Sequence, residues 1–165
     1  ADQMGMLSTV INGLYLQSVF QKEGIQSALY GSVGIPGICV PFSSRAALED
    51  IESGRVIICV GGTGNPFFTT DTTSVLRALE LKCDVVLKAT KVDGVYDKDP
   101  VTHKEAQRFE EISYKEVLDK QLRVMDLASI SLAADNKLPV IVFSLHEKNC
   151  FQKALAAGAH KTIIS

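Results

Sequence analysis

The chain has 165 residues, 46% of them hydrophobic and 22% charged, which is enough for one globular domain with a buried core. Seventeen basic residues against nineteen acidic ones give a formal net charge of -2 without a basic cluster, so we expect no nucleic acid partner. No apolar run reaches membrane-spanning length and the first residues lack a secretion-signal pattern, so we expect no membrane association.

Four cysteines stand singly in apolar surroundings, without a pair at the spacing of a metal site or a redox motif. They are Cys39, Cys59, Cys83 and Cys150. We expect these thiols to be reduced and to pack in the core as small hydrophobic groups. Such usage is typical of a cytoplasmic protein.

The first half of the chain alternates helical and extended patterns. Apolar residues at helical spacing predict an amphipathic helix over 2–23, ended by Gly24. The side chains expected on its inner face are Met4, Leu7, Val10, Ile11 and Leu14. Next we expect a strand over 27–30, a loop over 31–41, a helix capped by Ser43 or Ser44 and ending before Gly54, a strand over 56–60 and a helix over 74–81.

The second half continues the alternation. We expect a strand over 84–88, a charged loop over 89–100 and a short helix begun by a capping box of Ser113 and Glu116. Then follow a helix over 127–136 with Leu127, Ile130 and Ala134 inside, a strand over 139–143, a helix from the cap Asn149 to Ala157, and a strand over 162–164. The order predicts an α/β fold: a single domain over 1–165, built as a three-layer α-β-α sandwich with a mainly parallel sheet.

The stretch after the strand over 56–60 is the richest in potential ligand groups. Its sequence is Gly61-Gly62-Thr63-Gly64-Asn65-Pro66-Phe67-Phe68-Thr69-Thr70-Asp71. Glycines permit close backbone approach, hydroxyls donate hydrogen bonds and helix-start amides favour an anion, so a phosphate with part of a nucleoside suits this loop. A structural turn with Thr70 as helix cap suits it equally. We expect Phe67 and Phe68 to anchor the loop on the core rather than stack on a base.

Neither a dinucleotide fingerprint nor a P-loop occurs in the chain. The negative charge of Asp71, the carboxylate that follows the glycine loop, bears on whether a phosphate can bind there. Asp71, in the first helical turn, would repel a bound phosphate unless a cation stood between them. Since Mg²⁺ prefers carboxylates, water and phosphate oxygens together, Asp71 beside a magnesium nucleotide is one interpretation; stabilisation of the helix start is the other. Asp126 allows the same two interpretations, with capping favoured.

A second candidate site is the segment 88–100, which reads Lys88-Ala89-Thr90-Lys91-Val92-Asp93-Gly94-Val95-Tyr96-Asp97-Lys98-Asp99-Pro100. It follows a strand, and ligands bind at the carboxyl ends of strands in open α/β sheets. Asp93-Gly94 and Asp99-Pro100 are also ordinary turn dipeptides, so a structural loop is the alternative. We expect the three histidines, His103, His146 and His160, at surface or cap positions.

Four blocks of the chain, taken in order, resemble the bacterial-type uridylate (UMP) kinases of the amino-acid kinase superfamily. They are Asp2 with 4–7, then 62–71, then 88–96 with Asp99-Pro100, and finally 124–126 with Leu138-Pro139. The second and third blocks are highly specific. The resemblance extends over essentially the whole chain.

The resemblance implies transfer of the γ-phosphoryl group of Mg²⁺-ATP to UMP, giving UDP and ADP in pyrimidine nucleotide biosynthesis, by a cytoplasmic homohexamer. It makes 62–71 the UMP-binding loop and 88–100 the ATP-side loop. The positions that match UMP contacts are Asp2, Thr63, Gly64, Asn65, Pro66, Phe67, Phe68, Thr69 and Thr70, and those that match ATP contacts are Thr90, Tyr96 and Asp99. Asp71 matches an aspartate near the transferring phosphate, in a metal-binding or an orienting role, and Asp126 is the second catalytic candidate.

The chain departs from the resemblance at its start. Family members begin with a strand and a glycine turn carrying a lysine for the phosphates, followed by a Gly-Gly-Gly-Asn loop, and these 165 residues contain neither. We therefore expect an amino-acid kinase fold without its N-terminal third, and residues 1–165 inactive on their own. Gln17 and Gln21 stand where relatives often carry basic residues, which argues against regulation by GTP or UTP.

Two other functions are compatible with an amino-acid kinase fold. One is a related kinase acting on a carboxylate or carbamate, against which the loop over 63–71 argues. The other is a non-catalytic nucleotide-binding or regulatory protein, which the departure at the start favours. Phosphorylation of different acceptors by ATP separates the first from a UMP kinase, and nucleotide binding without turnover indicates the second.

Overall fold

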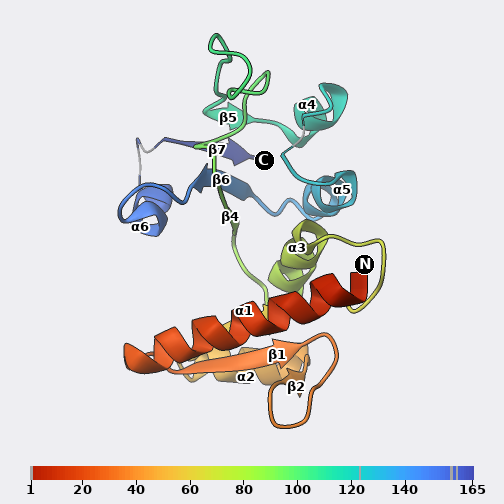
Figure 1. The fold of residues 1–165 in the computed structure, drawn as a ribbon. Helices are drawn as coiled ribbons and strands as arrows, with labels where there is room; N and C mark the ends of the chain where they lie inside the picture. Colours follow the sequence, from red (N-terminus) through yellow and green to blue (C-terminus); the bar gives the residue numbers. More distant parts are fainter. Residues whose placement is uncertain (1, 123, 157, 159) are drawn as a thin grey trace. The chain divides into compact units, whose positions relative to one another are not determined.

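The computed structural model describes residues 2–122, 124–156, 158 and 160–165, and the chain forms two compact units, Ala1–Thr73 and Ser74–Ser165 (Figure 1). Within the described residues, no helix combines the length and the apolar character needed to cross a bilayer. The expected single domain over 1–165 stays a prediction.

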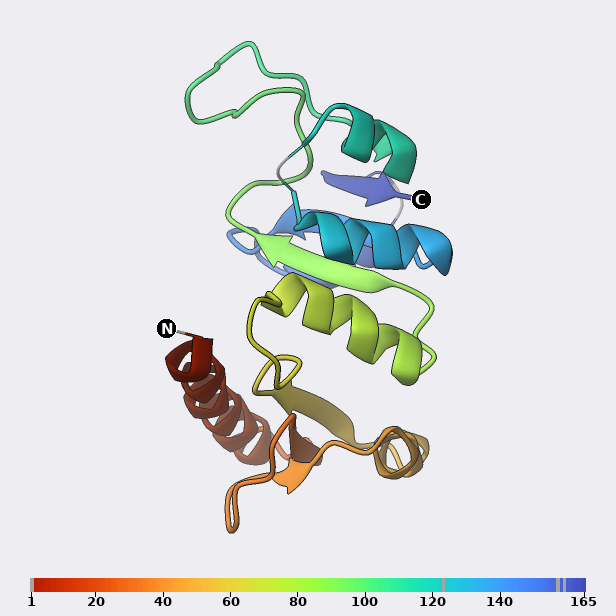
Figure 2. The same cartoon turned by 90° about the vertical axis from the view of Figure 1, so that its right-hand side faces the viewer.

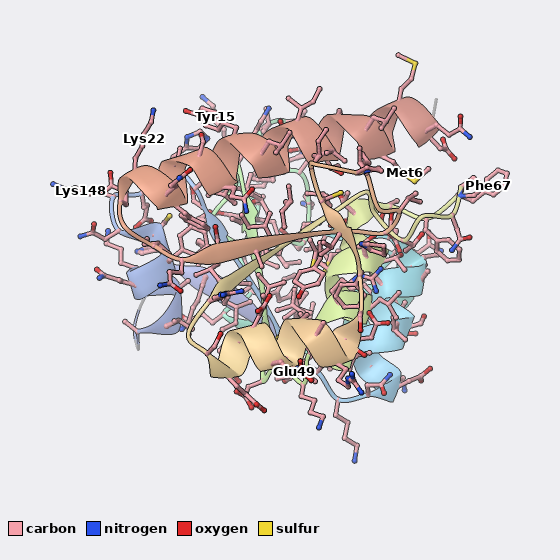
Figure 3. The ribbon with its side chains drawn as sticks, turned by 90° about the horizontal axis from the view of Figure 1, so that it is seen from below. Met6, Tyr15, Lys22, Glu49, Phe67 and Lys148 are labelled. Carbon is pink, nitrogen blue, oxygen red and sulfur yellow. The ribbon has the colours of Figure 1, made fainter. Side chains whose placement is uncertain are left out.

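The first unit is a small three-layer sandwich. Its parallel sheet has the order β2-β1-β3, formed by β1 (Ser27–Gly31), β2 (Val40–Pro41) and β3 (Val56–Val60). Helix α1 (Asp2–Lys22) lies on one face of the strands and α2 (Ser44–Glu52) on the other, as Figure 3 shows from below. The predicted strands over 27–30 and 56–60 are confirmed, whereas β2 lies in the segment expected to be loop.

Helix α1 buries a face different from the one predicted. Val10 and Gly13 are its buried residues, and Val10 packs with Leu29 and Ile58 in the core of this unit. A side chain at Gly13 would collide with Val60 and with Leu29, so the glycine lets the helix approach the strands closely. The prediction chose the most apolar stripe, but helix-to-sheet contact selected the face with the smallest residue.

The predicted inner face of α1 is therefore exposed except at Val10. Exposed fractions are 76% for Met4, 58% for Leu7, 69% for Ile11 and 38% for Leu14. Tyr15, on the same side, is 73% exposed and points away from the strands in Figure 3. We call Met4, Leu7, Ile11, Leu14 and Tyr15 the outer stripe of α1.

The ends of both helices follow the sequence signals. Gly24, at φ 72°, turns the chain out of α1 while the Ile25 amide donates to the Phe20 carbonyl at 2.8 Å. Ser43 is the N-cap of α2, and its hydroxyl accepts from the Ala46 amide at 3.5 Å. The predicted stop and one of the two predicted caps are confirmed.

The second unit is also layered. Its sheet has the order β4-β6-β7-β5, formed by β4 (Val86–Thr90), β5 (Glu111–Ile112), β6 (Val140–Ser144) and β7 (Lys161–Ile164). Its pairings are parallel except β6 with β7, which is antiparallel. Helix α6 (Cys150–Leu155) covers one face, and α4 (Tyr114–Asp119) and α5 (Leu127–Asp135) lie on the other (Figure 1). The α/β class with a mainly parallel arrangement is confirmed.

Strand β6 is buried on both faces, which explains its unbroken apolar run. Val140 and Val142 face one core together with Ile130 of α5 and Val75 of α3 (Thr70–Glu80). Ile141 and Phe143 face a second cluster together with Ala154 of α6. Successive side chains of a strand point to opposite faces, so both faces need apolar residues.

Several expectations for this unit need correction. Helix α3 begins four residues before the predicted start at 74, β4 runs two residues beyond the predicted 84–88, and β5 was not predicted. On α5 the buried positions are Ser129, Ile130 and Ala133, whereas Leu127 is 65% exposed. Asn149 lies at the N-cap of α6 in a left-handed conformation without a side-chain capping bond. The predicted helix end, Ala157, lies outside the described residues.

The cysteine prediction is right in one respect and wrong in another. None of the four cysteines forms a disulfide. Cys39 is buried in the first unit, but Cys59 and Cys83 are exposed and Cys150 is half-buried. Their position in apolar segments therefore does not place them all in a core.

The capping box predicted for α4 is present and can be tested. The Ser113 hydroxyl accepts from the Glu116 amide at 3.2 Å, and the Glu116 carboxylate accepts from the Ser113 amide at 3.4 Å. We expect Ser113→Ala to lower the free energy of unfolding by about 1 kcal/mol, because one amide of the first turn loses its acceptor. Urea unfolding measures this, and Ser18→Ala, an exposed serine inside α1, should cause no such loss.

The loss should depend on pH. Hydrogen bonds from Ser113, and then Lys120, lower the pKa of the Glu116 carboxyl. A group with a lowered pKa in the folded state stabilises the fold above its unfolded pKa, about 4.3, and ceases to do so as the pH falls through the folded value. The difference between wild type and Ser113→Ala should therefore shrink in acid; a constant difference down to pH 3 would contradict the reciprocal contact.

Candidate functional site

The glycine loop predicted as a ligand site leaves β3 and leads into α3. Gly61, Gly62 and Gly64 all have positive φ, at 81°, 62° and 81°. This backbone region favours glycine because side chains with a Cβ rarely adopt it. The three glycines are therefore required by the path of the loop.

Two side chains from neighbouring elements fix the start of the loop. The Gly61 amide donates to the Thr9 hydroxyl of α1 at 2.7 Å, and the Ser32 hydroxyl donates to the Gly61 carbonyl at 2.6 Å. A Cβ at Gly61 would collide with the Ser32 hydroxyl. The loop thus starts from a residue whose amide and carbonyl are both held by side chains of other segments. The sequence analysis did not predict this role for Thr9 or Ser32.

The predicted hydroxyl donors have specific local roles. Thr63 accepts from the Asn65 amide at 3.1 Å, which closes a small turn. Thr69 accepts from the Asp71 amide at 3.1 Å and the Thr72 amide at 3.4 Å, so it caps α3. Thr70 is the first helical residue, and its prediction as the cap is wrong by one position. Apart from half-buried Thr63, these threonines and Asn65 are exposed.

The aromatic pair does not anchor the loop on a core. Phe67 is 95% exposed and Phe68 is 54% exposed. Figure 3 shows the Phe67 ring pointing outward from the first unit, near the start of α1. Phe67 also has a positive φ of 71°, which is unusual for a residue with a Cβ. Contact with the core is therefore not what holds it there.

Asp2 is the residue that holds Phe67. Its carboxylate oxygen Oδ2 accepts from the Phe67 amide at 3.0 Å, across 65 positions of sequence. The first turn of α1 and the tip of the loop are thus in direct contact within the first unit. The assignment of Asp2 and 63–70 to one ligand stays a prediction.

The two catalytic candidates occupy helix starts. Asp71 lies half-buried in the first turn of α3, directly after the loop. Asp126 is the N-cap of α5, where its carboxylate accepts from the Ser129 amide at 2.8 Å. Asp71 belongs to the first unit and Asp126 to the second. The favoured interpretation of Asp126 as a cap is confirmed.

The second unit contains a cavity of about 690 Å³ at the carboxyl end of β4. A cavity of this size is in the range that accommodates a nucleotide-sized ligand. The residues around it are Lys88, Thr90, Val92, Gly94, Val95, Tyr96, Asp97, Lys98, Asp99, Pro100, Lys120, Gln121, Leu122, Val124 and Val142. All three predicted ATP-side residues, Thr90, Tyr96 and Asp99, are among them.

Hydrogen bonds fix the three predicted ATP-side residues in the lining of the cavity. The Thr90 hydroxyl bridges the amide of Val92 at 3.0 Å and its carbonyl at 2.7 Å, and Asp99 accepts from the Val101 amide at 2.9 Å. The Tyr96 hydroxyl donates to the Asp93 carboxylate at 2.6 Å. This hydrogen bond, followed by burial, raises the pKa of the Tyr96 hydroxyl. Tyr96 therefore stays a protonated donor at neutral pH.

Part of the cavity wall comes from a segment that sequence reasoning missed. Lys120, Gln121 and Leu122 follow α4, at least twenty residues beyond the predicted loop. With Lys88 and Lys98, Lys120 makes three lysines around a cavity that also has Asp97 and Asp99 in its lining. The ammonium group of Lys98 pairs with Glu105 and that of Lys120 with Glu116. Such lysines suit phosphate oxygens, but nothing local in the sequence marks Lys120 as a cavity residue.

The described residues contain no group of three or more histidine, cysteine or carboxylate side chains that could hold a metal ion by themselves. Mg²⁺ needs no such cage, because it usually binds one or two carboxylates together with phosphate oxygens and water. Asp71, in the first turn of α3 directly after the loop, is a carboxylate of the kind that a nucleotide-borne magnesium ion uses. His103 and His160 are exposed, as predicted, and so is His146.

Comparison with known proteins identifies close relatives. A model of the amino acid kinase family matches residues 1–144. The uridylate kinase of Agrobacterium fabrum is 48% identical over 163 residues, which cover 99% of this chain and 68% of that protein. The uridylate kinase of Magnetococcus marinus is 49% identical over 164 residues, with the same coverage of 99% and 68%.

Solved structures give the same result. The crystal structure of UMP kinase from Ureaplasma parvum matches with a TM-score of 0.96 at 33% identity, covering 100% of this chain and 71% of that one. UMP kinase from Bacillus anthracis matches with a TM-score of 0.94 at 34% identity, covering 99% and 68%.

The contact between Thr9 and Gly61 should be important for the fold of the loop. We expect Thr9→Val, which preserves shape but removes the acceptor, to lower the free energy of unfolding by about 1–3 kcal/mol because the Gly61 amide loses its partner. Thr9→Ser retains the hydroxyl and should cost distinctly less. Urea unfolding of both variants measures the difference, and equal losses would show that packing, not the hydrogen bond, holds the loop.

Proposed function

The chain belongs to the uridylate kinases of the amino acid kinase family, and from this membership we propose that it transfers the γ-phosphoryl group of Mg²⁺-ATP to UMP, giving UDP and ADP. The observation that carries the proposal is the loop over 62–71, with its glycine backbone turns, its tie to Asp2 and its direct entry into α3. The reaction belongs to pyrimidine nucleotide biosynthesis, and we place it in the cytoplasm.

The first unit provides the acceptor side. Asp2 stands beside the loop tip with one carboxylate oxygen already bound to the Phe67 amide, and we assign the ribose of UMP to this carboxylate. The loop residues proposed to surround UMP are Thr63, Gly64, Asn65, Pro66, Phe67, Phe68, Thr69 and Thr70. Since Phe67 and Phe68 are not used by a core, their rings are available to the ligand.

The second unit provides the ATP side. We assign ATP to the cavity at the end of β4, whose wall includes Thr90, Tyr96 and Asp99. The cavity combines apolar side chains such as Val95 and Leu122, which suit a base, with lysines that suit phosphates. This mixture is the one a nucleoside triphosphate requires.

Phosphoryl transfer depends mainly on positioning and on charge neutralisation. A UMP phosphate oxygen is already ionised, so the acceptor needs no general base. Bound Mg²⁺ would neutralise charge on the phosphates, and Asp71 offers it a carboxylate at the start of α3. Asp71 is accordingly the proposed catalytic residue, while Asp126 holds the start of α5 and is a second candidate.

The assay should compare the protein as its gene encodes it with the polypeptide of residues 1–165, because this chain spans 68% of the length of the Agrobacterium fabrum uridylate kinase. We expect ATP-dependent phosphorylation of UMP by the encoded protein, in preference to CMP and acetylglutamate, and no turnover by residues 1–165. Asp71→Asn should lower kcat about a hundredfold with little change in the KM for UMP, as expected for a group acting on the transferring phosphate.

Asp119→Asn, at an exposed carboxylate of α4, is the matched control and should leave kcat unchanged. A preference for acetylglutamate would instead favour a kinase for carboxylates. Nucleotide binding without turnover of any acceptor would favour a non-catalytic regulatory protein.

We further propose that the protein is a homo-oligomer, by family a hexamer, in which the outer stripe of α1 contacts a second copy. The stripe presents five large apolar side chains on one side of a single helix, and exposed apolar patches of this kind mark interaction sites. A symmetric contact between two copies of the same helix would cover both stripes at once.

Light scattering after gel filtration tests the oligomer. The wild type should have the mass of a hexamer, and Leu7→Glu with Ile11→Glu should give a smaller species because two charges would be buried in the contact. Val33→Glu replaces an equally exposed apolar residue outside α1 and should leave the mass unchanged. An unchanged mass in the α1 variant would exclude the stripe as the contact.

A further inference from the structure

The segment between β4 and β5 forms one wall of the cavity in the second unit and projects beyond the strands as a long loop (Figure 2). It has regular pairing only at its base, where Tyr96 and Arg108 form an antiparallel bridge. The Phe109 amide donates to the Val95 carbonyl at 2.9 Å, and the Asp97 amide donates to the Gln107 carbonyl at 3.1 Å. The position of the wall therefore depends on what holds this base.

A buried hydroxyl ties the base to the sheet. Thr162 of β7 is fully buried, accepts from the Val95 amide at 2.8 Å and donates to the Phe109 carbonyl. Both segments of the base, through Val95 and Phe109, are thus connected to one residue of β7. These two hydrogen bonds hold the backbone of the base against β7. They do not hold the side chain of Tyr96, which needs other partners.

Arg108 provides the second attachment. Its guanidinium donates to the Lys161 carbonyl of β7, and its Nε lies 3.7 Å from Oδ2 of Asp93. The other oxygen of Asp93 accepts from the Tyr96 hydroxyl at 2.6 Å. The Arg108 side chain is only 17% exposed, so water competes weakly for these contacts. His160 also approaches Asp93, at 3.8 Å, but it is 71% exposed.

Gly94 shows how closely this cluster is packed. A Cβ at Gly94 would lie 2.5 Å from the Thr162 hydroxyl and 2.8 Å from Cδ of Arg108. No side chain fits there unless Arg108 moves. Arg108 thus has a defined path between Gly94 and the carbonyl of Lys161, rather than the freedom of a surface arginine.

We propose that Arg108 is a positioning residue for nucleotide binding, which acts through Asp93 and Tyr96 to hold the 96–100 wall of the cavity in place. Tyr96 belongs to both the cluster and the cavity wall, whereas Arg108 and Asp93 are not among the residues that line the cavity. The identity of the ligand, ATP, rests on the proposed function.

The test compares variants of the protein as encoded, measured with Mg²⁺-ATP and UMP. We expect Arg108→Met to raise the KM for ATP about tenfold, the size of effect that losing a charge-assisted hydrogen bond produces, with the KM for UMP within about twofold of wild type. Arg108→Lys should recover part of the loss, because an ammonium can pair with Asp93 but lacks the fork that also reaches Lys161. Arg45→Met, at an exposed arginine of α2, is the matched control.

Combining Arg108→Met with Asp93→Asn should cause little more damage than Arg108→Met alone, since the two residues act through one contact. Independent effects that multiply, an ATP KM within twofold of wild type, or equal increases in both KM values would overturn the proposal. If Arg108→Met fails to fold, Asp93→Asn, which removes the charge that pairs with Arg108 at a residue outside the cavity lining, replaces it under the same KM criteria.

Hydrogen exchange separates this proposal from the proposed function. If the wild type binds no ATP, the proposed function fails, but Arg108→Met should still accelerate exchange of the Asp97 and Phe109 amides relative to the amides of β6. Unchanged exchange at the base would overturn the positioning role of Arg108.

Discussion

A hydroxyl on a neighbouring element fixes the loop that leaves a strand, and this constraint recurs in both units. In the first unit Thr9 of α1 accepts from the Gly61 amide as the chain leaves β3. In the second, Thr162 of β7 accepts from the Val95 amide beyond the end of β4. A buried amide needs a partner, and a partner on another element fixes the loop in space. Both candidate ligand sites depend on these two contacts.

With their bases fixed, the outer parts of the loops remain available to ligands. Phe67 and Phe68 are exposed, and the 96–100 segment faces a cavity of about 690 Å³. Phosphoryl transfer needs loops with a fixed base and an accessible outer part, because its rate depends on holding two phosphates in position while their charge is neutralised. The strained backbone at Phe67, held by Asp2, is the local cost of presenting the loop in this form.

Elements and caps with strong local sequence signals were predicted correctly. The strand over 56–60, the capping box of Ser113 and Glu116, the stop at Gly24 and the cap at Asp126 all depend on residues within a few positions of one another. The chain's membership of the uridylate kinases was also predicted from motifs. The same local reasoning failed for α1, where the apolar stripe suggested one buried face and close packing of Gly13 against β3 selected another.

The α/β class, most strands and helices, and the residue groups 62–71 and 88–100 follow from short stretches of sequence, because periodicity, capping and glycine turns involve residues only a few positions apart. Four other features depend on how the chain packs: Thr9 holds Gly61, Lys120 borders the cavity, Arg108 reaches Asp93 and α1 exposes its outer stripe. Each of these contacts joins segments far apart in sequence or depends on how closely two elements pack. No local pattern contains that information.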